Sequence, residues 1–353
     1  MHKLFTSSYD ASIYLQQPEQ NAGRDEILEV GKLYYGSTKD ISRTLIKFDV
    51  ANMGIPSGSI IYLNLKSSQA EEIPLEYTIY ANAVSQSWSM GTGTKFDNIT
   101  SDGVSWKYRN GVNSWQDNTL GGTAVFAAGT TGSANAEGGT WYTGSEASQT
   151  YNYEDADVRM NVTGIVNLWL SGSIPNNGFI VRHSLADEEN TLDYGVLKFF
   201  SKETNTIYEP KLEVVWNDTT FATGSLLPVT GSAEDDYKVV ITNLKREYSK
   251  DSKIKIRIKG RDMFPLKSFS TIFEYDQSKY LPTSSYYQLE DYITNDVIYP
   301  FGEYTKISCD STSNYFILDL NTLPLYRTYR LKLKVIDGDI STIIDDKLTF
   351  QIV

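Results

Sequence analysis

Three aspartates carry the side chains best suited to bind a small ligand directly. Asp155 and Asp157 stand two residues apart in YNYEDADVRMN (residues 151–161), so they share one face of an extended segment. Asp10 opens the first strand of the same half of the chain and could reach the same edge. Hard oxygen ligands clustered in this way suit Ca²⁺, so a structural Ca²⁺ ion is the one cofactor that the sequence suggests, and none is required. The spacing matches no dedicated Ca²⁺ loop, and a solvated turn before a helix is the alternative.

Four aromatic residues form a second candidate site, because sugar recognition uses flat rings beside polar groups. They are Trp106, Tyr108, Trp115 and Trp141, and all lie in a Gly-, Thr- and Ser-rich stretch, residues 91–150. Aromatic residues do not belong in a flexible linker, so we expect long ordered loops lying over a sheet. The same rings could instead anchor these loops by packing. Trp115→Ala separates the two interpretations, since it would remove either glycan binding or stability.

No set of residues for catalysis stands out. The 44 acidic residues always offer a pair for glycoside hydrolysis, but nothing singles one pair out. A serine hydrolase would need a Gly-x-Ser-x-Gly turn and a histidine, whereas His183 lies in an alternating strand. The single cysteine, Cys309, excludes an internal disulfide and is best explained as a small strand residue. We therefore expect a protein that is not an enzyme.

Charge and hydropathy narrow the range of partners. The formal net charge is −12, and a nucleic-acid groove or an anionic membrane surface would need an excess of Lys and Arg. Neither nucleic acid nor membrane is therefore an expected partner. The first residues, MHKLFTSSYDASIYLQQ, lack the apolar core of a signal peptide. No later segment approaches the roughly 20 apolar residues that span a bilayer.

Apolar and polar residues alternate along most of the chain. KIKIRIKG (residues 253–260) and YRLKLKVIDG (residues 329–338) are two such segments, and each is bounded by turn-forming residues. Short alternating segments of this kind indicate antiparallel β-sandwiches. One segment departs from the pattern, because NVTGIVNLWLSG (residues 161–172) has apolar residues at i, i+3, i+4 and i+7. That spacing predicts one short amphipathic helix.

The length of 353 residues exceeds what one core usually organises, so two domains are expected. NTIYEPKLEVVW (residues 205–216) has the pattern of a closing strand, and the polar segment that follows shows little periodicity. We place a first domain at residues 1–216, a linker at 217–235 and a second domain at 236–353. The predicted fold class is all-β, with two β-sandwich domains in series. The first would be jelly-roll-like with one short helix, and the second immunoglobulin-like.

Five motifs in the first domain, taken in order, resemble the DNRLRE-type β-sandwich, a carbohydrate-binding-module-like jelly roll. They are DASIYLQQPEQNAGRDEILEVG (residues 10–31), RTLIKFDVANMGIPSGSIIYLNLKS (43–67), GVSWKYRNGVNSW (103–115), DVRMNVTGIVNLWLSGSIPNNGFIVRHS (157–184) and FFSKETNTIYEPKLEVVW (199–216). The resemblance implies a binding or structural module, and it carries fold better than activity. Arg43, in the second motif, is expected to pair with a buried carboxylate or carbonyl.

The second domain resembles, more loosely, a segment found in virion structural proteins of T-even-type tailed phages. The resembling stretches are ITNLKREYSKDSKIKIRIKGRDMFPLKSFS (residues 241–270), LPTSSYYQLEDYITNDVIYPFGEYTKISCDSTSNYF (281–316) and YRLKLKVID (329–337). This resemblance implies a structural protein of a tailed-bacteriophage virion, at the neck, tail, baseplate or capsid surface, assembled in the host cytoplasm. Its expected partners are other virion proteins or further copies of itself.

Two other functions remain open from the sequence. One is a glycan-binding adhesin whose first domain contacts the host surface while the second serves as its mount. The other, with less support, is a polysaccharide-degrading enzyme.

Overall fold

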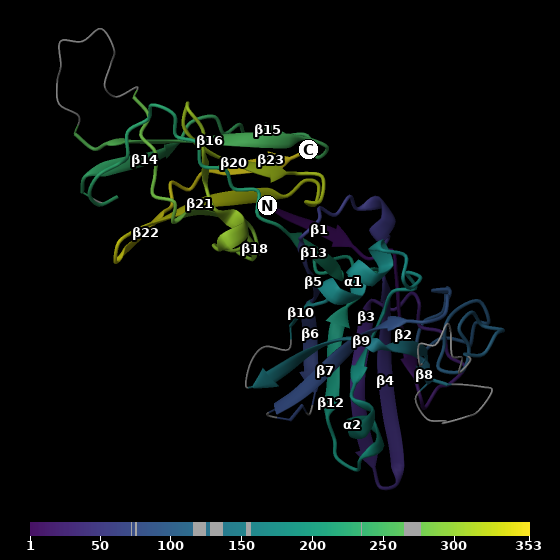
Figure 1. Cartoon of the computed structure of the whole chain (residues 1–353). Helices are drawn as coiled ribbons and strands as arrows, with labels where there is room; N and C mark the ends of the chain where they lie inside the picture. Colours follow the sequence, from purple (N-terminus) through teal and green to yellow (C-terminus); the bar gives the residue numbers. More distant parts are fainter. Residues whose placement is uncertain are drawn as a thin grey trace. The chain divides into compact units, whose positions relative to one another are not determined.

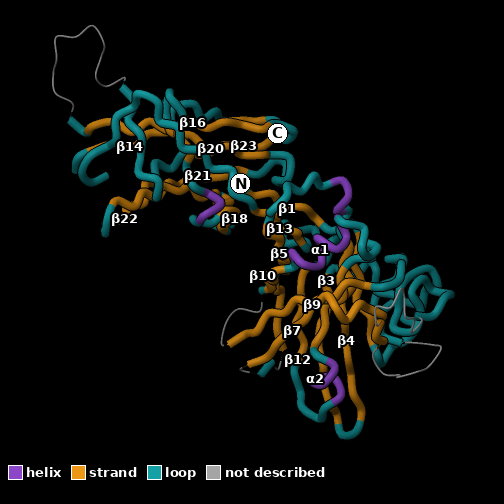
Figure 2. The backbone as a smooth tube through the Cα atoms, viewed as in Figure 1, coloured by secondary structure: helices purple, strands orange, loops and turns teal. Residues whose placement is uncertain are grey.

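The computed structural model describes residues 1–71, 73–74, 76–115, 125–127, 137–152, 157–233, 235–264 and 277–353. Strands dominate these ranges and the two α-helices within them are short, so the predicted all-β class is confirmed (Figure 2). The chain folds into two compact units (Figure 1). Unit 2 is Phe5–Val214, and unit 1 is Met1–Leu4 together with Val215–Val353. The division falls beside Trp216, where the sequence places the end of the first domain.

Unit 2 contains a large antiparallel sheet and most of a small one. Within the described residues the large sheet has nine strands, in the order β6-β12-β3-β4-β11-β7-β9-β8 with β2 paired to β4. Its strands are β2 Tyr9–Tyr14, β3 Ile27–Tyr35, β4 Thr38–Lys47, β6 Ser67–Glu71, β7 Glu76–Val84, β8 Val125–Ala127, β9 Thr140–Asn152, β11 Phe179–His183 and β12 Gly195–Phe200. The small sheet has the order β1-β13-β5-β10 and comprises β1 His2–Thr6, β5 Ile60–Leu65, β10 Val158–Asn161 and β13 Lys211–Val215.

The helix predicted from the spacing of apolar residues is present as α1, Thr163–Leu170. It buries Ile165, Val166 and Trp169, and the Trp169 ring centroid lies 4.6 Å from that of Phe179 on β11. A 3-10 turn, η1 (Val50–Asn52), also contacts α1. The amphipathic pattern therefore marks a helix that packs against the large sheet.

The stretch expected as long loops, residues 91–150, is only partly loop. β9 begins at Thr140 and pairs with β7, and β8 pairs with β9 in turn. Residues 86–115 and 137–139 remain as turns and bends, and we call them the loop layer. They pack on one face of the large sheet, where a cluster that we call the outer-face core consists of Ala11, Ile13, Ile41, Leu45, Val84, Val104, Trp106, Trp115, Trp141 and Ile180.

A buried amide ties the loop layer to the start of the chain. Asn21 has no exposed surface; its Nδ2 donates to the carbonyls of Met90 (2.7 Å) and Val104 (2.8 Å), and its Oδ1 accepts from the N–H of Gly93 (2.7 Å). A Cβ atom at Gly103 would lie 2.2 Å from the same Nδ2. The glycines of this stretch thus allow the backbone to close around one side chain, which is why a Gly-rich segment is ordered.

Unit 1 contains two further sheets and its own core. Within its described residues the sheets have the orders β14-β16-β20-β19 and β15-β23-β21-β17-β18, with β22 paired to β21. The strands are β14 Tyr237–Ile241, β15 Glu247–Tyr248, β16 Lys253–Asp262, β17 Ser285–Asp291, β18 Val297–Tyr299, β19 Ser308–Cys309, β20 Asn314–Asp319, β21 Thr328–Asp337, β22 Ile340–Ile344 and β23 Thr349–Ile352. A 3-10 turn, η3 (Glu303–Thr305), precedes β19. The apolar residues predicted on β16 and β21, among them Ile256, Ile258, Leu331 and Leu333, lie in one core cluster.

Residues 217–235, expected as a linker, are counted with unit 1. Val229 is buried in its core, and isolated bridges join Phe221 to Cys309 and Pro228 to Tyr280. A segment held by isolated β-bridges, rather than by a continuous strand, has no alternation of apolar and polar residues. Its sequence therefore resembles that of a linker.

Among the described residues, no helix has the length and apolar content to cross a lipid bilayer.

Candidate functional site

The outer-face core surrounds a buried ion pair. Arg43 of β4 and Glu188 are each 1% exposed. The guanidinium donates from Nε to Glu188 Oε1 (3.0 Å), from Nη2 to Glu188 Oε2, and from Nη1 to the carbonyl of Gly138. The prediction that Arg43 pairs with a buried carboxylate or carbonyl is confirmed, and it pairs with both.

Glu188 is held by α2, Leu185–Glu189, a helix that the sequence analysis did not predict. Ser184 caps this helix, because its Oγ accepts from the N–H of Asp187 at 3.0 Å, and Leu185 packs against the outer-face core. A helix of five residues is too short to show a 3.6-residue period. The signal that could have revealed it is the serine cap with an acidic residue three positions later, directly after a strand.

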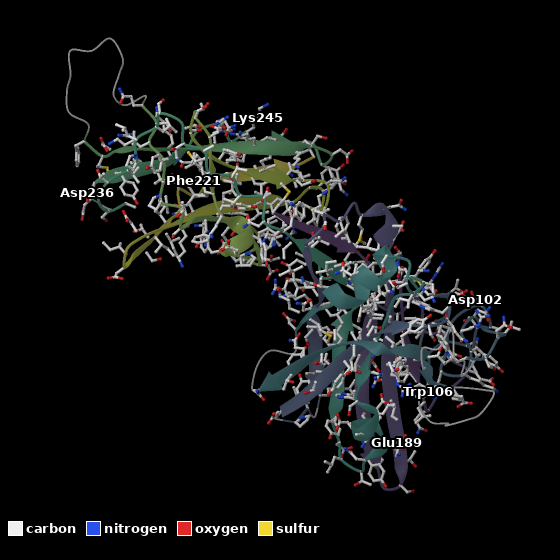
Figure 3. All side chains as sticks on the ribbon, viewed as in Figure 1. Asp102, Trp106, Glu189, Phe221, Asp236 and Lys245 are labelled. Atoms are coloured by element: carbon white, nitrogen blue, oxygen red, sulfur yellow. The ribbon has the colours of Figure 1, made fainter. Side chains whose placement is uncertain are left out.

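Two indoles lie against the Arg43 guanidinium. Its Cζ is 4.7 Å from the ring centroid of Trp106 and 5.3 Å from that of Trp141. Gly138 makes this approach possible: its φ is +79°, and a Cβ there would lie 2.6 Å from Arg43 Nη1 and 2.7 Å from the Trp106 ring. Figure 3 labels Trp106 beside the strands, with Asp102 farther out in the same loop layer.

A groove opens on the same face of the large sheet, and we call it the sheet-face groove. Its volume is about 330 Å³, within the range of small-molecule sites. Adjacent strands supply most of its wall, since Arg182 of β11 pairs with Tyr80 of β7, and Asn82 of β7 pairs with Glu146 of β9. The full lining is Tyr80, Asn82, Trp141, Thr143, Glu146, Arg182, Ser184 and Leu185.

Arg182 is the central charged group of the sheet-face groove. Its Nη2 donates to Asn82 Oδ1 (2.9 Å) and lies 3.5 Å from Glu146 Oε2. Its Cζ lies 4.3 Å from the ring centroid of Trp141, so this one indole contacts both guanidiniums. Burial, and then the charge of Arg43, lower the pKa of Arg182 to about 10, which leaves it charged at neutral pH. The groove thus presents a fixed cation between an amide and a carboxylate.

The aromatic residues expected to bind sugar do not form an exposed platform. Trp106, Trp115 and Trp141 are at most 3% exposed, and Trp115 Nε1 donates to the Ser105 carbonyl at 3.1 Å. An indole without an exposed face cannot stack on a sugar ring, so the sugar-binding expectation for these three is corrected: they anchor the loop layer. Tyr108 is half-buried, with Lys107 Nζ 5.1 Å from its ring centroid.

The described residues do not fit the expected Ca²⁺ site. Asp10 is buried on β2, where its Oδ2 accepts from the N–H of Lys202 (2.6 Å). Asp157 is half-exposed before β10 and accepts from the N–H of Ser67 (2.8 Å) and from Lys66 Nζ (2.6 Å). Asp155 lies outside the described residues. No cluster of three or more His, Cys, Asp or Glu that could hold a metal occurs in the part described. Asp10 and Asp157 are bound by protein N–H donors instead, and they share none of these donors.

His183 and Cys309 lie inside the fold. His183 has no exposed surface, and burial lowers its pKa to about 4. Cys309 is 1% exposed, and burial raises the pKa of its thiol to about 11. Both side chains are therefore neutral at physiological pH and shielded from solvent.

Comparison with known proteins leaves the family of this chain open. No protein-family model and no curated protein matches it. One matching solved structure is a DUF4785 family protein from Legionella pneumophila, at 10% sequence identity and a TM-score of 0.19. The match covers 99% of this chain and 61% of that one, so this chain spans about three fifths of its length. At that TM-score the likeness supports no conclusion on fold or function.

Glu188→Gln is expected to lower the free energy of unfolding by about 3–5 kcal/mol, because it leaves the buried Arg43 charge without a counter-ion. Glu189→Gln, one position along the same helix, is the matched control. Glu189 is 62% exposed and pairs with Lys39 at the surface, so its loss should cost less than about 1 kcal/mol. Urea unfolding followed by tryptophan fluorescence measures both. Equal effects of the two substitutions would contradict the assigned role of Arg43.

Asp10→Asn is expected to stabilise the protein more at alkaline than at acidic pH. Among the described residues Asp10 Oδ1 has no hydrogen-bond partner, and burial raises the pKa of the carboxyl from 3.8 to about 7. The folded state therefore holds a proton that the unfolded chain has released, and stability falls as pH rises from about 4 to 7. The asparagine removes this loss. Its gain over wild type should be about 2–3 kcal/mol larger at about pH 8 than at about pH 5.

The matched control for Asp10→Asn is Asp157→Asn, which removes the surface pair with Lys66 and should bring no gain at either pH. A gain from Asp10→Asn that is the same at both pH values would show that the carboxylate is not held in an unfavourable buried state.

Proposed function

We propose that this protein is a non-enzymatic structural component of a tailed-bacteriophage virion that acts by packing against other virion proteins. The observation that carries the proposal is an exposed apolar patch on unit 1. The patch comprises Tyr292, Ile293, Leu325 and Tyr326, whose exposed fractions lie between 40% and 75%. Exposed apolar and aromatic side chains gathered in one place are typical of protein interfaces.

The patch comes from two segments that the structure holds together. Asp291 ends β17, is 1% exposed and accepts from Arg327 Nε at 2.7 Å, next to Tyr326. The N–H of Tyr292 also donates to the carbonyl of Thr328 at 2.9 Å. Because a partly buried ion pair and a backbone hydrogen bond fix both segments, the apolar side chains have little freedom to rearrange, and this favours docking to a partner.

The resemblance of residues 236–353 to T-even-type virion proteins supports the setting. The neck, tail, baseplate and capsid surface are all consistent with it, and assembly would take place in the host cytoplasm. The burial of His183 and Cys309 agrees with a role that needs no chemistry. The partners would be other virion proteins, including copies of this chain.

Purified phage particles are expected to contain the chain in a fixed ratio to the other structural proteins, measured by quantitative mass spectrometry. Ile293→Asp should lower its copy number about tenfold or more, because a charge enters the packed centre of the contact. Val112→Asp is the matched control: Val112 is an apolar residue of unit 2 that is 74% exposed, and its replacement should leave incorporation unchanged. Absence of the wild-type chain from particles would refute the proposal.

A second candidate, a glycan-binding adhesin module, is favoured by the sheet-face groove. The half-buried Tyr80 lies in this groove beside Asn82, Glu146 and Arg182, which combines a ring with hydrogen-bonding groups. The resemblance of unit 2 to DNRLRE-type modules supports the same candidate. This site differs from the tryptophans that the sequence singled out, apart from Trp141 in its wall.

If the groove binds a glycan, Tyr80→Ala should abolish binding on a glycan array while the melting temperature changes little. Tyr35→Ala is the control, since Tyr35 is 62% exposed at the end of β3 and lies outside the groove. Binding that survives Tyr80→Ala, or the lack of any glycan ligand for the wild-type chain, would rule this candidate out.

A further inference from the structure

We propose that the hairpin formed by β21 and β22 in one copy of the chain docks into a basic groove on unit 1 of a second copy. This self-association deepens the proposed virion role and rests on it for its biological setting. The basic groove has a volume of about 580 Å³ and lies where β14 ends and where β15 meets β23. We define it by Leu244, Lys245, Arg246, Lys347, Leu348, Thr349 and Phe350, which belong to its lining.

The rim of the basic groove carries three cations, and the described residues provide none of them with a counter-ion. Lys245, Arg246 and Lys347 are exposed, and none of them forms an ion pair with a residue in the described part of the chain. Figure 3 labels Lys245 at this edge of unit 1. One acidic residue, Glu247, also lines the groove. Since the whole chain has a net charge of −12, an unpaired basic groove is an exception that favours an acidic partner.

The floor of the groove offers apolar surface and an open strand edge. Leu244 and Leu348 are half-buried and Phe350 is buried. β15 pairs only with Gln351 and Ile352 of β23, so the preceding residues, Thr349 and Phe350, have no described strand on that edge. An added strand could hydrogen-bond there, as in β-strand augmentation.

The β21–β22 hairpin has the complementary features. Its tip carries Asp337 and Asp339, both exposed, on either side of Gly338, whose φ of +57° opens the two-residue turn. Ile340 and Ile343 on β22 are 52% and 57% exposed. Among the described strands β22 pairs with β21 alone, which leaves its outer edge open. The hairpin thus offers two carboxylates, two exposed isoleucines and a free strand edge. The basic groove offers the matching features, which are three cations, an apolar floor and a free strand edge.

The hairpin cannot fill the groove of its own unit. Figure 1 shows β22 projecting from unit 1 on the side away from β15 and β23. A contact between these two regions therefore joins different copies head to tail. Contacts of this kind are heterologous, and they build rings when the rotation closes and filaments when it does not.

Sedimentation velocity of the purified full-length chain over a range of concentrations tests the docking. We expect concentration-dependent self-association that weakens between about 0.05 M and 1 M salt, because screening reduces the charge attraction. Two double variants should each raise the Kd of self-association about tenfold or more. The groove variant is Lys245→Glu with Arg246→Glu, and the hairpin variant is Asp337→Lys with Asp339→Lys.

An equimolar mixture of the groove variant and the hairpin variant is the decisive experiment. Each interface in the mixture again joins opposite charges, so association should return to near the wild-type level. Misfolded variants could not regain it. The control Arg24→Glu with Lys238→Glu makes the same change in net charge as the groove variant, at exposed positions outside the groove, and should behave as wild type.

A wild-type chain that stays monomeric at every concentration would overturn the docking. So would variants that associate as wild type does, or a mixture that does not recover. These results are independent of the virion role. A chain found in particles but monomeric in solution refutes the docking alone, and a self-associating chain absent from particles refutes the virion role alone.

Discussion

The guanidinium of Arg43 is the constraint on which the arrangement of unit 2 depends. It cannot lose its proton inside a protein, so its burial demands partners on every side. Those partners are Glu188 from α2, the Gly138 carbonyl from the loop layer, and the rings of Trp106 and Trp141. Gly138 and Trp106 belong to the loop layer, Glu188 to α2 and Trp141 to β9. One charge therefore fixes a helix and the loop layer against one face of the large sheet.

The sheet-face groove follows from this arrangement. Trp141 lies against Arg43 and Arg182 at once, so the ion pair positions the wall of the groove as well as the core behind it. Unit 1 is built differently: its core is closed by its own sheets, and its apolar patch, basic groove and hairpin lie on the outside. The groove proposed for a glycan is thus in unit 2, whereas the surfaces proposed for protein contacts are in unit 1. The two candidate functions draw on separate units.

Much of the fold could be predicted because, in a strand that is buried on one face, apolar and polar residues alternate. β16 and β21 follow that rule, α1 shows the helical spacing, and Arg43 was expected to need a carboxylate or carbonyl. The site could not be predicted in the same way. The five residues of α2 are too few to show the 3.6-residue period of a helix. β9 lies in a stretch whose glycines and threonines are typical of loops. Whether Trp115 is exposed or buried depends on a layer of loops that Asn21 closes from far along the chain.

Hydrogen–deuterium exchange measures most directly whether the loop layer packs on the outer-face core. The N–H of Val104 donates to Ser89 O, that of Ser105 to Tyr108 O and that of Gly138 to Trp106 O, all within the loop layer. If the layer packs around Arg43 as described, these three amides exchange almost as slowly as those of β4, within about tenfold. Exchange of all three at the rate of an unstructured peptide, while β4 stays protected, would contradict the account.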